Sequence, residues 1–141
     1  MKSIKAYLIV LLLLLSACKE AEDPYVWKPM VVTATAYNSV RSQTQGNPII
    51  AAWGDSLKIE TPSIAVSRNL IALGLTHNTP VKIEGFDSIF LVRDKMHRRW
   101  RNRIDIYMGT DIKKAKDWGK KKLTIHYGVL KDSLENDLET Q

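Results

Sequence analysis

The densest run of chemically active side chains lies between residues 93 and 103. Six of these eleven residues are cationic, with His97 and Trp100 between them: Arg93, Lys95, Arg98, Arg99, Arg101 and Arg103. Guanidinium groups bind carboxylates and phosphates through paired hydrogen bonds, and an indole ring stacks on ring-shaped ligands. The segment is therefore either a site for an anionic polymer or a solvated loop whose charged ends point into water.

Two aspartates flank this basic segment. Asp94 stands at the end of one apolar run, and Asp105 alternates with Ile104 and Ile106 inside another. The period of two predicts that both isoleucines face the core and that Asp105 faces the opposite side. Partial removal from water raises the pKa of a carboxyl group and lets it act as a general acid. Structural salt bridges to the nearby arginines are the alternative for a bare pair of aspartates.

Metal and phosphate chemistry have little support in the sequence. His77, His97 and His126 are scattered, and neither His-Glu-x-x-His nor a pair of cysteines accompanies them. No metal site is therefore expected. Gly-x-x-x-x-Gly-Lys-Ser/Thr and Gly-x-Ser-x-Gly are also missing from the sequence, so phosphate-loop and nucleophile-elbow chemistry are not expected either.

The N-terminus has the pattern of an export signal. Lys2 and Lys5 precede ten apolar residues, which is half of the roughly 20 that a membrane-spanning helix needs. Residues 1–17 are therefore predicted to be a signal peptide. Leu15-Ser16-Ala17-Cys18 matches the lipobox of bacterial lipoproteins, in which the cysteine thiol receives a diacylglycerol. An ordinary secretory signal with a leftover thiol is the alternative.

The lipobox predicts where the protein lies. Cys18 would anchor the chain in the cell envelope, at the outer membrane, on its periplasmic face or at the cell surface, with residues 18–29 as a tether. Because such a protein rarely meets nucleic acid, nucleic acid is not expected as a partner, although the chain carries a net charge of +6.

The apolar pattern predicts the elements that position these residues. A hydrophobic share of 45% and a charged share of 26% in 141 residues indicate one globular domain. Strand patterns occur at 31–37, 64–66, 81–84, 89–92, 104–107 and 123–127, and one helix pattern at 111–118. Short strands that close on themselves lose their exposed edges, so we expect an all-β barrel over residues 30–130. A long loop at 38–55 should cover one face, and residues 131–141 should be an acidic, disordered tail.

Several short motifs carry a family resemblance. The sequence resembles the three-aspartate (3D) domain over residues 31–130, through Val32–Tyr37, Ile64–Ser67 continuing to Gly74, Val92–Asp94, Asn102–Tyr107 and Trp118-Gly119. That family is similar to the catalytic barrel of membrane-bound lytic transglycosylase A and, more distantly, to rare lipoprotein A. The resemblance implies a double-psi β-barrel of about six strands with one short helix before the last strand.

The resemblance also implies roles for individual residues. Asp105 takes the position of the catalytic acid, and Asp94 is its partner in one groove. With the arginines of the basic segment added for their charge, the expected substrate-binding residues are Ser67, Tyr37, Arg98, Arg99, Arg101 and Arg103. The expected protein is a cell-envelope lipoprotein that cleaves peptidoglycan glycan strands as a lytic transglycosylase, with no metal or organic cofactor.

Two departures from the family pattern support a rival. Ser67 stands where the family has its first aspartate, and Lys95-Met96-His97 replaces Thr-Gly-Gly. Both favour a non-catalytic peptidoglycan-binding module. A lipoprotein that supports a partner complex is a third possibility, and the sequence does not indicate an oligomeric state.

Overall fold

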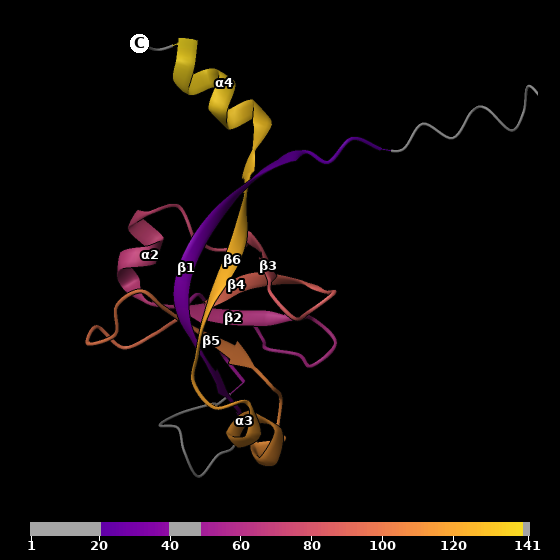
Figure 1. Cartoon of the computed structure of the whole chain (residues 1–141), viewed down its shortest axis with the longest axis vertical. Coiled ribbons are helices and arrows are strands. Elements are labelled where there is room, and N and C mark those ends of the chain that lie inside the picture. Colours follow the sequence, from indigo (N-terminus) through magenta and orange to yellow (C-terminus); the bar gives the residue numbers. More distant parts are fainter. Residues whose placement is uncertain (1–20, 40–48, 140–141) are drawn as a thin grey trace, which may run out of the picture.

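The computed structural model describes residues 21–39 and 49–139 (Figure 1). The elements in chain order are β1 (Tyr25–Tyr37), β2 (Ser63–Val66), α2 (Arg68–Ala72), β3 (Pro80–Ile83), β4 (Ile89–Lys95), β5 (Arg103–Tyr107), α3 (Ile112–Trp118), β6 (Lys121–Leu130) and α4 (Lys131–Glu139). The predicted signal peptide and Cys18 lie outside the described residues. None of the described helices is long and apolar enough to cross a membrane.

The six strands form one closed barrel in the order β1-β5-β2-β4-β3-β6. β1 runs parallel to β5 and β2 runs parallel to β4, whereas the other neighbours are antiparallel. If β1, β2 and β3 are replaced by β4, β5 and β6, respectively, and the reverse, the order of strands around the barrel stays the same. The parallel pair β1–β5 then becomes the parallel pair β4–β2. The expected all-β barrel of about six strands is confirmed, and its strand order has an internal twofold symmetry.

Alternating side chains fill the barrel. Ten of the inward-facing residues are at most 2% exposed: Val32, Ala34, Ile64, Val66, Val81, Ile83, Val92, Ile104, Ile106 and Ile125. Most of them are β-branched, and such side chains pack well on a pleated surface. Burying each Val or Ile side chain contributes about 1.5–3 kcal/mol. The residues between them on each strand are thereby turned to the outer face.

The N-terminal boundary of the barrel differs from the expected one. β1 begins at Tyr25, not near residue 30, and residues 25–29 pair with residues 126–130 of β6. Asp23 fastens the start of β1, because its carboxylate accepts hydrogen bonds from Tyr25 N at 3.0 Å and Trp27 Nε1 at 2.6 Å. The expected tether of residues 18–29 is therefore too long by its last seven residues.

The C-terminal segment also differs, because residues 131–139 form α4 instead of a disordered tail. α4 continues from β6 beyond the end of the barrel (Figure 1). Lys131 N donates to Pro24 O at 3.0 Å, which ties the start of α4 to the chain before β1. Asp132 in the first turn interacts favourably with the helix dipole.

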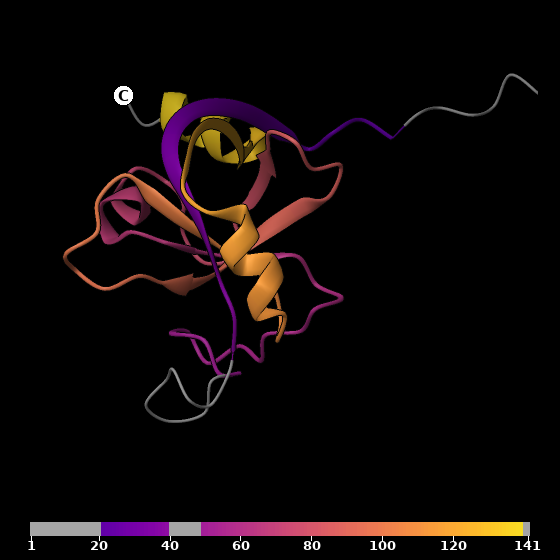
Figure 2. The same ribbon diagram turned by 60° about the horizontal axis from the view of Figure 1, so that its bottom comes forward.

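The short helices flank two sides of the barrel. α3, the helix expected before the last strand, lies across the lower end of the barrel (Figures 1 and 2). Its N-cap is Asp111, whose Oδ1 accepts a hydrogen bond from Lys114 N at 2.9 Å. α2, which the sequence did not predict, lies beside the basic loop 96–102, and Asn69 Nδ2 joins the two by donating to Asn102 Oδ1 at 2.5 Å.

Candidate functional site

Four strands place the two aspartates in one row. Thr35 of β1 pairs with Asp105 of β5, Asp105 pairs with Ala65 of β2, and Ala65 pairs with Asp94 of β4. Neighbouring strands lie about 4.8 Å apart, so Asp94 and Asp105 are separated only by the strand that carries Ala65. The methyl group of Ala65 leaves the space between them open.

A β-bulge turns Asp94 towards this row. Ile64 pairs with Val92, but the next residue, Ala65, pairs with Asp94, so Arg93 is an extra residue on β4. Val92 faces the core and is fully buried. Strict alternation would turn Asp94 inward as well, and the extra residue turns it to the outer face with Ala65 and Asp105.

The two aspartates line one open pocket of about 140 Å³. Its lining residues are Tyr37, Ala65, Asp94, Lys95, Met96, His97, Trp100 and Asp105. A larger pocket of about 200 Å³ lies near α3 and is lined mainly by apolar side chains, and its carboxylate, Asp111, caps α3. The smaller pocket is the candidate site because two carboxylates, a phenol and an indole meet there.

Asp105 is held as a weak acid. Burial raises its pKa, and the nearby Asp94 charge adds to this effect, whereas the Thr35 hydroxyl and Arg103 oppose it, with a net pKa of about 6. Thr35 Oγ1 donates to Asp105 Oδ1 at 2.9 Å. Asp105 forms no ion pair with another described residue, so the salt-bridge alternative is not supported. A carboxyl group with this pKa holds and releases a proton near neutral pH.

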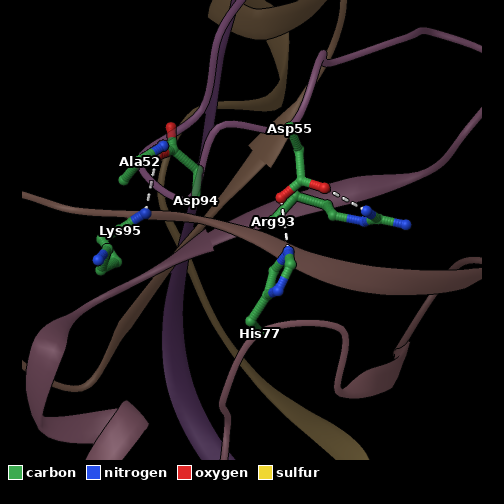
Figure 3. Close-up of polar contacts among 6 residues, drawn as sticks. All are labelled: Ala52, Asp55, His77, Arg93, Asp94 and Lys95. Atoms are coloured by element: carbon green, nitrogen blue, oxygen red, sulfur yellow. Dashed lines mark hydrogen bonds and ion pairs between the residues drawn. The ribbon is translucent and has the colours of Figure 1, made fainter.

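Asp94 is held by the backbone. Its Oδ1 accepts hydrogen bonds from Ala52 N and Lys95 N, both at 2.8 Å (Figure 3). Two N–H donors stabilise negative charge on this oxygen. Asp94 is thus oriented by a neighbouring loop and by its own strand.

Tyr37 brings a hydroxyl group to the same pocket. Its hydroxyl oxygen is buried and has no hydrogen-bond partner within the described part of the chain. Burial, together with the charges of Asp94 and Asp105, raises the pKa of Tyr37 far above its ordinary value. The phenol therefore keeps its proton and lies, covered, next to the Asp94 carboxylate.

Ser67 does not lie in the pocket, and its expected place there is wrong. The residue is fully buried. Its hydroxyl donates to Asn69 Oδ1 at 2.9 Å and accepts a hydrogen bond from Arg103 N at 3.0 Å. Ser67 therefore fastens the start of α2 to β5 and does not reach a substrate.

The arginines form a cationic rim next to the pocket. The guanidinium carbon of Arg103 lies 3.9 Å from the centroid of the Trp100 ring, and that of Arg99 lies 4.7 Å from it. Arg98, Arg99 and Arg101 are exposed. None of these four arginines forms an ion pair with a residue that the structure describes. Their charge is therefore available to an anionic ligand.

Sequence reasoning missed the residues that position the two acids. Thr35 and Ala65 have no chemical motif of their own, and only their strand pairing brings them to the aspartates. Ala52 acts through its backbone N–H, which no side-chain pattern can indicate. The potential metal ligands His, Cys, Asp and Glu form no cluster of three or more in the ranges 21–39 and 49–139.

Comparison with known proteins leaves the site to be interpreted from its geometry. No protein-family model matches the chain, and a search of curated proteins finds no significant match.

Proposed function

We propose that this protein is a cell-envelope lipoprotein that cleaves peptidoglycan glycan strands as a lytic transglycosylase, with Asp105 as its acid and base. The observation that carries the proposal is the pocket in which Asp105 faces outward beside Asp94 and Tyr37. The likeness of the motifs around these residues to the 3D domain supports the same reaction.

The reaction needs only one carboxyl group to transfer protons. Asp105 donates its proton to the glycosidic oxygen, the bond between that oxygen and C1 of the muramyl residue breaks, and the leaving strand departs with a free hydroxyl. An oxocarbenium-like centre develops at C1. The C6 hydroxyl of the same sugar then attacks C1 and returns its proton to Asp105. No water is consumed, and the product is a 1,6-anhydro sugar.

The neighbouring groups suit a developing positive charge. Asp94 carries a negative charge one strand away from Asp105, and such a charge stabilises an oxocarbenium-like centre. The covered Tyr37 hydroxyl lies beside Asp94 and keeps its proton, so it adds a polar group and no charge to this side of the pocket. Trp100 offers an aromatic surface at the pocket rim, and the arginines beside it attract the carboxylates of the cell-wall polymer.

The proposed anchor keeps the barrel near the membrane. With Cys18 as the lipidated N-terminus, four residues (19–22) lie between the anchor and Asp23, where the contacts of β1 begin. The five Cα–Cα steps from Cys18 to Asp23 span at most about 18 Å. The site would therefore meet glycan strands close to the outer membrane. Two or three acyl chains are enough for stable anchoring.

The binding module remains the second candidate because the pocket is small. Its volume of about 140 Å³ lies below the roughly 300 Å³ at which pockets for small-molecule ligands begin. Lys95, Met96 and His97 line this pocket at the positions where the resembled family has a threonine and two glycines. A crowded groove of this kind holds a sugar edge without enclosing the bond to be cleaved.

The test uses the mature chain with Cys18→Ser, which removes the lipid anchor and leaves the barrel unchanged. It is incubated with purified peptidoglycan, and mass spectrometry measures 1,6-anhydro-muramyl ends. We expect these ends with the parent chain, none with Asp105→Asn, and an unchanged amount with Asp87→Asn, which removes an exposed carboxylate outside the pocket.

Co-sedimentation with peptidoglycan separates the two candidates. Binding without anhydro ends would support the binding module and reject the enzyme. If the chain neither binds nor cleaves peptidoglycan, both candidate functions are rejected.

A further inference from the structure

A second polar cluster lies next to the pocket but outside it. Asp55 accepts a hydrogen bond from Arg93 Nη1 on Oδ1 and shares one with His77 Nε2 on Oδ2, both at 2.5 Å (Figure 3). Burial alone would raise the pKa of Asp55, but the hydrogen bonds from His77 and Arg93 hold it below its ordinary value. We call these three residues, Asp55, His77 and Arg93, the Asp55 clamp.

The clamp joins three segments that are far apart in the sequence. Asp55 lies on the loop before β2, His77 on the turn before β3, and Arg93 is the bulge residue of β4. Their side chains are 18%, 35% and 25% exposed, respectively. An isolated surface ion pair contributes little, but here both carboxylate oxygens are engaged and all three side chains are largely covered.

The loop held by the clamp is one compact turn. Ala51 N donates to Asp55 O and Gly54 N donates to Ala51 O, both at 2.8 Å. Gly54 has a φ of +88°, which favours glycine. The Trp53 ring stacks on His77 at 5.2 Å between centroids, and Lys95 Nζ lies 4.5 Å from the Trp53 ring centroid. The side chain of Asp55 and the N–H of Ala52 therefore belong to one docked unit.

This unit reaches Asp94 directly. Ala52 N donates to Asp94 Oδ1 at 2.8 Å, and Arg93, the residue before Asp94, is held by Asp55. The clamp thus fixes both the bulge that turns Asp94 outward and the loop that donates to its carboxylate. Arg93 Nε is buried without a partner within the described residues, so the loss of Asp55 would leave this guanidinium poorly compensated.

We propose that Asp55 is a positioning residue, which docks the loop 51–55 on β4 through Arg93 and His77 and thereby orients the Asp94 carboxylate beside Asp105. The orienting role stands on these contacts, and only its consequence for turnover rests on the proposed function. A displacement of about 1 Å of a reacting group costs up to about 100-fold in rate.

The experiment measures the Ala52 amide and the Asp94 carboxyl group by NMR, in the labelled mature chain with Cys18→Ser. An amide that donates to a carboxylate shifts when that carboxylate titrates. We expect the Ala52 amide to follow the titration of Asp94 in the parent chain and to lose this dependence in Asp55→Asn, with the signals of core residues such as Ile125 unchanged. Asp55→Glu keeps the charge and should restore part of the dependence.

Two further variants make the result specific. Asp117→Asn removes the exposed ion pair with Lys113 on α3 and should change neither signal. His77→Ala leaves the contact between Asp55 and Arg93 in place, so the Ala52 amide should lose less of its pH dependence than in Asp55→Asn. This variant tests the proposal if Asp55→Asn does not fold. An Ala52 amide that follows Asp94 equally in the parent chain and in the folded clamp variants would overturn the proposal.

Turnover separates this proposal from the proposed function. If the parent chain cleaves glycan, Asp55→Asn should lower kcat by about 10-fold to 100-fold with little change in KM, because Asp94 is misplaced while the arginine rim is intact. If the parent chain cleaves nothing but the Ala52 signal responds as expected, the proposed reaction fails and the positioning role stands. If the parent chain cleaves glycan but the Ala52 signal does not respond to the clamp variants, the proposed reaction stands and the positioning role fails.

Discussion

Asp105→Asn should make the folded protein more stable near neutral pH. Burial disfavours the ionised form of Asp105 in the folded protein, and its pKa is therefore raised from 3.8 to about 6. Each pKa unit corresponds to about 1.4 kcal/mol, so the full cost is about 3 kcal/mol. Because the pocket is open to water, we expect asparagine to recover about 1 to 3 kcal/mol at pH 7.5. The Thr35 hydroxyl still has an amide oxygen to donate to.

The gain should depend on pH in a defined way. Below pH 3.8 the parent carboxyl group is protonated in both the folded and the unfolded chain, so the two proteins should be equally stable. As pH rises from 3.8 to about 6, the parent loses stability because the unfolded chain ionises Asp105 while the folded protein still holds the proton. The difference between variant and parent therefore grows between these values and is complete above pH 7.

Urea unfolding of both proteins at pH 3.5, 5 and 7.5 measures this difference, and Asp87→Asn controls for the loss of a negative charge from the surface. A difference that does not change with pH would refute the reasoning. So would a variant that is less stable at pH 7.5, because that is the result expected if Asp105 served the fold through a salt bridge.

Further perturbations test other parts of the molecule. Cys18→Ser should move the protein from the detergent phase to the soluble envelope fraction, and unchanged partition would reject the anchor. Binding to peptidoglycan should weaken between 0.05 and 0.5 M salt, because the screening length falls from about 14 to about 4 Å. This loss should be smaller when Arg98, Arg99 and Arg101 are replaced by glutamine. An affinity that does not depend on salt would mean that the arginine rim is only solvated surface. Thr35→Val removes a hydrogen bond that lowers the pKa of Asp105, so the carboxyl titration followed by NMR should move to higher pH, and a lower midpoint would contradict the assigned contact. Gly128→Ala places a Cβ 2.9 Å from Pro80 Cγ and 3.0 Å from the Tyr25 ring. Urea unfolding should therefore show a loss of about 1–3 kcal/mol in the free energy of unfolding. An unchanged stability would mean that β1 shifts to make room for the methyl group.

Local patterns predicted the strands well because burial imposes them residue by residue. Ile104 and Ile106 are buried around Asp105, as the alternation predicted, and all six expected strands are present. α4 was missed because four acidic residues in the tail concealed the helical spacing of Leu134 and Leu138. β1 begins earlier than predicted and includes Pro29, although proline is disfavoured in strands because it lacks the N–H.

The candidate site depended on the sequence for its residue types and on the tertiary structure for its geometry. Asp94, Asp105 and the basic run are visible in the sequence because charge and apolar spacing are local properties. Their meeting was decided by the order of strands in the barrel, which places Ala65 between the two aspartates. The bulge at Arg93 decided the direction of Asp94, and the loop docked by Asp55 decided its hydrogen bonds. The tertiary structure also excluded Ser67 from the site, because its hydroxyl is buried and hydrogen-bonded to Asn69 and to the backbone of Arg103. Apart from the hydrogen bond between Ser67 and Asn69, these features join residues more than 20 positions apart, and their energies arise only when the barrel closes, so no local pattern contains them.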